Sequence, residues 1–158
     1  IDVLKTRECN MHVTLEPGRA IVGNAGVLLT KVEYIKKGPE KNFAIVDAAM
    51  NDLIRPALYE AWHDVVEVNK TVNRDSRKCD VVGPVCESGD FLARDRMLAI
   101  GQDDLVAVRS AGAYGFVMSS NYNARPRAAE VMVDGDAFHV IRERESTASL
   151  FSSEHLLR

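Results

Sequence analysis

The chain has 158 residues, a hydrophobic fraction of 46% and a formal net charge of −3. This length is sufficient for one ordinary domain with a hydrophobic core. The acidic balance, without basic residues interleaved among aromatic ones, argues against a nucleic-acid surface. No apolar run reaches the roughly 18 residues needed to cross a bilayer. We therefore expect neither a nucleic-acid partner nor a membrane partner.

Alternation of apolar and polar residues at period two predicts several half-buried strands. In Val27–Ile35 the side chains on one face are those of Leu28, Thr30, Val32 and Tyr34. Asn42–Ala49 and Asp104–Ser110 are further strand candidates. The clearest hairpin joins Val131–Val133 to Ala137–Ile141 through Asp134-Gly135, a pair that favours the tight turns matching strand twist.

Helical patterns are sparse. Leu53–Val65 has apolar residues at helical spacing, and Pro56 suits its first turn. The tail Ser146–Leu157 predicts a short helix with Ser146 as its cap. The sequence thus predicts a mainly β protein, a sandwich or partly open barrel, with one or two short helices.

The cysteines are odd in number and irregularly spaced: Cys9, Cys79 and Cys86. This usage is typical of reduced thiols and indicates a cytoplasmic protein. The histidines show no ligand spacing, so we expect no metal site. The chain lacks an initiator Met and begins as if within an element, so we expect the carboxyl-terminal part of a longer protein.

Gly83–Asp90 places the thiol of Cys86 beside the carboxylate of Glu87, in a bend framed by glycine and proline. A thiol there can exchange protons with a substrate while the carboxylate holds a charged group. The segment alone fits equally well a small buried cysteine in a tight turn, with Glu87 facing water. Asp90, Arg94 and Asp95 are interpreted as structural ion pairs.

With the following Phe91–Asp95, this segment resembles the cysteine-bearing motif of the diaminopimelate decarboxylases, pyridoxal-phosphate enzymes of the group IV decarboxylase family. Three further motifs agree in family order: Glu16–Arg19, Met50–Tyr59 and Ser110–Gly115. The resemblance runs from about residue 14 to about residue 145. Four ordered motifs are far more specific than any one of them.

The resemblance implies a TIM-type barrel followed by a β domain. Residues 1–22 would be the last barrel strand and its exit, and residues 23–158 the carboxyl-terminal β domain. A pyridoxal enzyme needs a lysine that forms a Schiff base with the cofactor. No lysine of this chain stands in the family's Schiff-base motif, and the glycine-rich phosphate loop is absent. We therefore expect the chain alone, without its amino-terminal barrel, to be inactive.

The resemblance assigns cofactor contacts to Glu16, Gly18, Arg19 and Tyr114. Glu16 would pair with the pyridine nitrogen of pyridoxal 5'-phosphate, which keeps the ring protonated and able to accept electrons. Position alone places Glu16 and Arg19 at the end of a strand, where barrel enzymes build their sites. From the residues alone, two alternatives remain open. Glu16 and Arg19 could be solvated charges in a turn, and Tyr114 could be an aromatic residue of a strand.

The substrate-binding residues implied by the resemblance are Arg19, Arg55, Tyr59, Glu87 and Tyr114. Arg55 precedes Pro56, which favours extended backbone at the mouth of a helix, a suitable place to bind an anion. The alternative is that Arg55 is an ordinary surface residue and that Tyr59 packs in the core. Cys86 would be the catalytic proton donor. Cys86 and Glu87 would reach the partner's site in a homodimer.

The implied reaction converts meso-2,6-diaminopimelate to L-lysine and CO2. The distal carboxylate of this substrate would be bound by Arg19 and Arg55, and its distal ammonium group by Glu87. Ornithine or lysine would leave the arginines unpaired. Two alternatives remain: a related decarboxylase of arginine or of a carboxylated polyamine precursor, and a non-catalytic homologue that acts as a binding domain.

Overall fold

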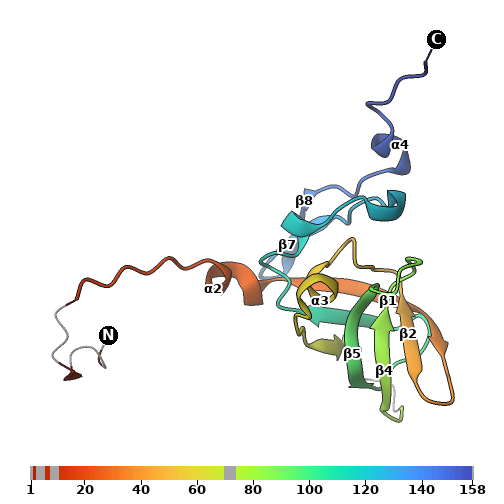
Figure 1. Cartoon of the computed structure of the whole chain (residues 1–158), viewed down its shortest axis with the longest axis horizontal. Helices are drawn as coiled ribbons and strands as arrows, with labels where there is room; N and C mark the ends of the chain where they lie inside the picture. Colours follow the sequence, from red (N-terminus) through yellow and green to blue (C-terminus); the bar gives the residue numbers. More distant parts are fainter. Residues whose placement is uncertain (1, 3–5, 8–10, 70–73, 158) are drawn as a thin grey trace.

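The computed structural model describes residues 2, 6–7, 11–69 and 74–157. Most of it is a six-stranded sheet with the strand order β3-β6-β1-β2-β4-β5 (Figure 1). Its strands are β1 (Val27–Lys36), β2 (Asn42–Val46), β3 (Val65–Glu67), β4 (Arg77–Val82), β5 (Phe91–Leu98) and β6 (Leu105–Arg109). Neighbouring strands are antiparallel, except that β2 and β4 are parallel.

The sheet nearly closes on itself, because its two edge strands β3 and β5 lie against each other. Arg96 Nη2 donates a hydrogen bond of 3.0 Å to the carbonyl oxygen of His63, just before β3. The backbone N–H of Ala99, just after β5, donates to Glu67 Oε1 at 2.8 Å. Side chains thus join edges that would otherwise stay open, and the predicted mainly β, barrel-like fold is confirmed.

The core lies inside this sheet, and valine, whose β-branched side chain packs well on a pleated surface, is its commonest residue. Its fully buried members include Val32, Val46, Val81, Leu92, Val106 and Val108. Leu53, from the loop after β2, also packs into this cluster. The sheet therefore forms a rigid base for the loops between its strands.

Short helices and a separate hairpin complete the described chain. They are α2 (Arg19–Val22), η1 (Gly23–Ala25), α3 (Arg55–Tyr59), η2 (Phe116–Met118), η3 (Tyr122–Ala124), β7 (Glu130–Asp134), β8 (Ala137–Arg142) and α4 (Thr147–Leu150). Figure 1 shows residues 11–18, before α2, running away from the sheet as an arm, with the β7–β8 hairpin standing apart from the sheet.

The predicted strands are confirmed, with one error of side-chain orientation. A register shift between Val32 and Tyr34 interrupts the alternation of β1. Leu28, Thr30 and Val32 point inward as predicted, whereas the Tyr34 side chain is 56% exposed. A β-bulge adds one residue and so reverses the faces beyond it. The predicted strand 42–49 also ends early, at Val46.

The helix predicted over Leu53–Val65 is wrong, since α3 has only five residues. Glu60 follows it with φ 52°, a left-handed conformation that ends the helix. Pro56 does occupy the first turn. The tail helix is also shorter than predicted, but its cap is confirmed, because Ser149 N donates to Ser146 Oγ at 3.1 Å.

Residues 11–18 have no regular secondary structure. A barrel strand at this place requires neighbouring strands to pair with, so the boundary at residue 22 stays a prediction. Within the described ranges no helix is long and apolar enough to cross a membrane. The same residues contain no group of three His, Cys, Asp or Glu side chains that could hold a metal ion.

Candidate active site

Two arginines and two tyrosines gather where α2, α3 and the loop after β6 meet. The guanidinium carbon of Arg19 lies 5.6 Å from the ring centroid of Tyr114, and that of Arg55 lies 5.4 Å from the same ring. Arg55 is also 5.2 Å from the ring of Tyr59. Each contact is within cation–π distance. We call Arg19, Arg55, Tyr59 and Tyr114 the cationic cluster.

Two glycines allow the backbone to assemble this cluster. A Cβ atom on Gly112 would lie 2.0 Å from the carbonyl oxygen of Val22, at the end of α2. One on Gly26 would lie 2.4 Å from the Cα of Gly112. Only glycine tolerates such an approach, so the loop bearing Tyr114 can pack directly against the helix bearing Arg19.

The short helix α3 sets the position of Arg55 and Tyr59. Arg55 is its first residue, so the extended backbone predicted for Arg55 is wrong, and the buried Pro56 preorganises the first turn. Tyr59 follows four residues later on the same face, which explains why its ring faces the Arg55 guanidinium. None of the ion pairs found among the described residues includes Arg19 or Arg55. The cluster is therefore suited to binding an anion.

Cys86 and Glu87 lie exposed in a second loop, residues 83–90, which we call the thiol loop. Asp90 folds this loop back on itself, since Val85 N donates to Asp90 Oδ2 at 2.7 Å and Gly83 N donates to Asp90 O at 3.2 Å. Cys79, the other free cysteine in the described ranges, is buried, and burial raises its pKa to about 11. Only Cys86 therefore offers an accessible thiol among the described residues.

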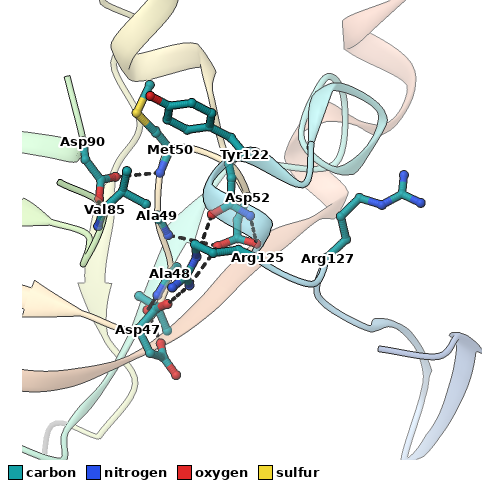
Figure 2. A network of polar contacts seen from close by, with 12 residues as sticks. Asp47, Ala48, Ala49, Met50, Asp52, Val85, Asp90, Tyr122, Arg125 and Arg127 are labelled. Atoms are coloured by element: carbon teal, nitrogen blue, oxygen red, sulfur yellow. Dashed lines mark hydrogen bonds and ion pairs between the residues drawn. The ribbon is translucent and has the colours of Figure 1, made fainter. Parts of the chain in front are cut away.

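Asp90 also joins the thiol loop to the loop that leads into α3. Met50 N donates to Asp90 Oδ1 at 2.7 Å, a bond visible in Figure 2. Asp90 is 4% exposed, and this burial raises the pKa of its carboxyl group, although both N–H donors act in the opposite direction. The prediction of an ion pair for Asp90 is wrong, because its carboxylate binds backbone amides.

Of the two other residues predicted to form ion pairs, Asp95 does form one, with Lys78 at 3.0 Å, whereas Arg94 stacks on Phe91.

A third loop, residues 119–125, is tied to the same base by Arg125 (Figure 2). Arg125 Nε donates to Asn51 Oδ1 at 2.9 Å, and Arg125 Nη2 donates to the carbonyl oxygen of Asp47 at 2.6 Å. Asn51 is 1% exposed, and its Nδ2 donates to the carbonyl oxygen of Ser120 at 3.2 Å. The loops bearing Arg55, Cys86 and Tyr122 are therefore held together by buried polar contacts.

The structure brings together four of the predicted site residues in the cationic cluster. Gly18 lies beside it, because a Cβ atom there would be 3.5 Å from the Tyr114 hydroxyl. Glu16 is exposed on the irregular segment 11–18. Cys86 and Glu87 belong to the thiol loop, where Tyr122 Oη donates to Glu87 Oε2 at 3.4 Å.

Sequence reasoning missed the residues that hold these loops: Asn51, Asp90, Tyr122 and Arg125. One signal was present for two of them. Asn and Asp in loops favour hydrogen bonds with nearby backbone groups, and both Asn51 and Asp90 stand in such positions. Arg125 gave no comparable local signal.

The comparisons with known proteins agree with these motifs. Over residues 4–112 the chain matches the C-terminal sheet domain of the pyridoxal-dependent decarboxylases. The chain belongs to this family. It is 63% identical over 150 residues to diaminopimelate decarboxylase of Pseudomonas aeruginosa, a match that covers 94% of this chain and 35% of that protein.

Two solved structures of diaminopimelate decarboxylases in complex with L-lysine share the fold. The one from M. jannaschii has a TM-score of 0.87 and 38% identity, covering 98% of this chain and 36% of that one. The one from Helicobacter pylori has a TM-score of 0.82 and 44% identity, covering 88% and 34%. This chain thus spans about a third of the length of the curated relatives it matches.

Proposed function

We propose that this chain is the carboxyl-terminal part of a diaminopimelate decarboxylase, which converts meso-2,6-diaminopimelate to L-lysine and CO2. The observation that carries this proposal is the pair of guanidinium groups gathered on Tyr114, free of carboxylate partners among the described residues. A substrate with a second carboxylate satisfies such a pair, whereas lysine, ornithine and arginine have only the carboxylate at the reacting carbon. The identity to diaminopimelate decarboxylases supports the same substrate.

The residues of the cationic cluster fit the cofactor that the family uses. A guanidinium, a phenolic hydroxyl and the side-chain-free Gly18 lie together, and such donors suit a phosphate group. Gly18 and Tyr114 would hold the phosphate end, with Arg19 beside them, and Glu16 would pair with the pyridine nitrogen. When bound, pyridoxal 5'-phosphate supplies an electron sink for the carbon that loses its carboxyl group.

The chain's own residues bind the substrate and deliver a proton. Arg19 and Arg55 bind the distal carboxylate, with the hydroxyl groups of Tyr59 and Tyr114 completing the pocket. Glu87 accepts hydrogen bonds from the distal ammonium group. The Cys86 thiol donates its proton to the carbon left by CO2, which makes Cys86 the catalytic residue of this chain.

The proposal includes a homodimer in which Cys86 and Glu87 of each subunit enter the site of the other. Both side chains are exposed at the surface of the thiol loop, where a second subunit can meet them. The loop is nevertheless held rigidly by Asp90. A rigid loop with exposed functional groups suits a site that is completed only on assembly.

The experiment that tests this function measures CO2 release from meso-diaminopimelate in the presence of pyridoxal 5'-phosphate. We expect none from the chain alone and release from the full-length protein that includes the upstream region. A panel with arginine, lysine, ornithine and a carboxylated polyamine precursor tests the related decarboxylases. No release from meso-diaminopimelate by the full-length protein would overturn the proposal, as would equal rates across the panel.

Replacing Arg55 tests the role of the cationic cluster. In the full-length protein, Arg55→Ala should raise KM for meso-diaminopimelate by roughly two orders of magnitude, because the distal carboxylate loses a charged partner. Arg77→Ala, on the exposed part of β4, is the matched control and should leave KM unchanged. An unchanged KM in Arg55→Ala would remove Arg55 from the site. Full activity in Cys86→Ala would favour a non-catalytic binding role for this domain.

A further inference from the structure

The carboxylate of Glu87 is oriented from two sides. Its Oε1 accepts a hydrogen bond of 2.9 Å from the backbone N–H of Ser88, and its Oε2 accepts one from Tyr122 Oη at 3.4 Å. The second bond is longer than a usual O–H···O bond of about 2.5–3.0 Å. It therefore directs Oε2 while leaving lone pairs free for a stronger donor such as an ammonium group.

Tyr122 stands on a loop with little freedom to move. Its backbone N–H donates to Ser120 Oγ at 3.3 Å, and the preceding Asn121 donates from Nδ2 to Glu145 Oε2 at 2.7 Å. The following residues Asn123 and Ala124 have φ of 57° and 52°, conformations that persist only where the surroundings impose them. The hydroxyl of Tyr122 is thus presented to Glu87 from a fixed place.

The two partners come from different loops, which lie 35 residues apart in sequence. The loop of Tyr122 is fixed to Asn51 by Arg125, and the loop of Glu87 is fixed to Met50 by Asp90. Because Asn51 and Met50 are adjacent, one short segment sets the distance between hydroxyl and carboxylate. Such an arrangement positions a recognition group more closely than either loop could alone.

We propose that Tyr122 is a positioning residue that orients the Glu87 carboxylate and thereby favours substrates with a distal ammonium group. This inference rests on the proposed function, in which Glu87 binds that group. It assigns Tyr122 a role in substrate selection and no contact with the reacting carbon.

The test compares two substrates in the full-length enzyme. One is meso-diaminopimelate, and the other is 2-aminopimelate of the same configuration at the reacting carbon, which keeps both carboxylates and lacks the distal amino group. Tyr122→Phe should lower kcat/KM for meso-diaminopimelate about three- to tenfold, the usual effect of one lost hydrogen bond. The loss should lie in KM, and kcat/KM for 2-aminopimelate should not change.

Two controls separate positioning from a general structural effect. Tyr34→Phe removes the same hydroxyl from an exposed tyrosine of β1 and should leave both substrates unaffected. In a Glu87→Ala background, which removes the acceptor of the Tyr122 hydroxyl, Tyr122→Phe should cause no further loss, since residues that act as one unit show strong coupling in a double-mutant cycle.

The remaining outcomes separate a failure of the positioning role from a failure of the proposed function. Equal losses for both substrates in Tyr122→Phe, or a full additional loss in the Glu87→Ala background, would overturn the positioning role of Tyr122. The absence of any loss in kcat/KM for either substrate would do the same. If the wild-type enzyme releases no CO2 from meso-diaminopimelate, the proposed function itself fails, before any variant is compared.

Discussion

Asp90 and Glu145 both use a carboxylate to hold a loop of the candidate site, in opposite surroundings. Asp90 is 4% exposed and accepts hydrogen bonds from the backbone N–H groups of Met50 and Val85. Glu145 is partly exposed and accepts from Arg127 Nε at 2.8 Å, from Arg127 N at 2.9 Å and from Asn121 Nδ2 at 2.7 Å. One carboxylate therefore relies on buried amides, and the other on a neighbouring cation.

The two environments shift the carboxyl pKa values in opposite directions. Burial raises the pKa of Asp90, whereas hydrogen bonds from Arg127 lower the pKa of Glu145 to about 2. The difference shows that the same anchoring role can be filled in two ways. The buried anchor depends on exact pairing of N–H groups with oxygens, and the exposed one on charge.

Asp90 and Glu145 are called the two anchors of the loops. Of the changes that distinguish them, Asp90→Asn should lower the free energy of unfolding most. The amide replaces one acceptor oxygen with an NH2 group, so either Met50 N or Val85 N is left without an acceptor. A buried amide without a partner costs about 1–3 kcal/mol of unfolding free energy. Urea denaturation at neutral pH measures this loss. Asp136→Asn, on the exposed turn of the hairpin, is the matched control and should change stability by less than about 0.5 kcal/mol.

The same variant also tests whether the anchor serves the chemistry. Because Asp90 fixes the thiol loop, Asp90→Asn in the full-length enzyme should lower kcat at temperatures where the protein remains folded. The Cys86 thiol, which we propose as the proton donor, would then spend less time in position. A destabilised variant with unchanged kcat would make Asp90 a purely structural residue.

Glu145→Gln should have a smaller effect on stability than Asp90→Asn. Glutamine keeps one oxygen that can accept from Arg127 or Asn121, and the lost ion pair is partly exposed to solvent. The loss of unfolding free energy in Glu145→Gln should become smaller as salt is added, because salt screens exposed charges. Glu143→Gln, on the exposed segment after β8, is the matched control. A loss that does not respond to salt would show that charge is not what makes Glu145 an anchor.

Periodicity predicted β1, β2, β6 and the β7–β8 hairpin, but it did not predict β3, β4 or β5. The four residues of the cationic cluster were predicted from the resemblance to the group IV decarboxylases and not from periodicity. It could not predict the reversal at Tyr34, since a bulge depends on how two strands pair. It overestimated the helix after Leu53, because helical spacing of apolar residues also occurs in the irregular segment Ala61–Asp64. The exposed Trp62 of that segment stacks on Arg96 of β5, a contact between distant segments.

The long-range partners of the residues that hold the loops could not be predicted from the sequence for a similar reason. Asp90 was interpreted as an ion-pair partner from its charge, yet its partners are backbone amides of residues five and forty positions away. Arg125 reaches back 74 residues to Asn51. The local signal at Asp90 points to nearby backbone groups such as Val85 N, but neither Asp90 nor Arg125 gives a local sign of its distant partner.

The smallest expected effect, and the sharpest distinction between the anchors, is the pH dependence of their contributions. The lowered pKa of Glu145 means that its contribution is present above pH 4.5 and is lost as the pH falls toward about 2. The raised pKa of Asp90 means the reverse: its contribution is fully present below pH 3.8 and is lost as the pH rises through the raised value. The stability difference between wild type and Glu145→Gln should therefore grow as the pH rises through the acid range. The difference between wild type and Asp90→Asn should fall as the pH rises above 3.8. Urea denaturation of the three proteins at a series of pH values measures both differences, and slopes of the same sign would show that burial does not govern Asp90.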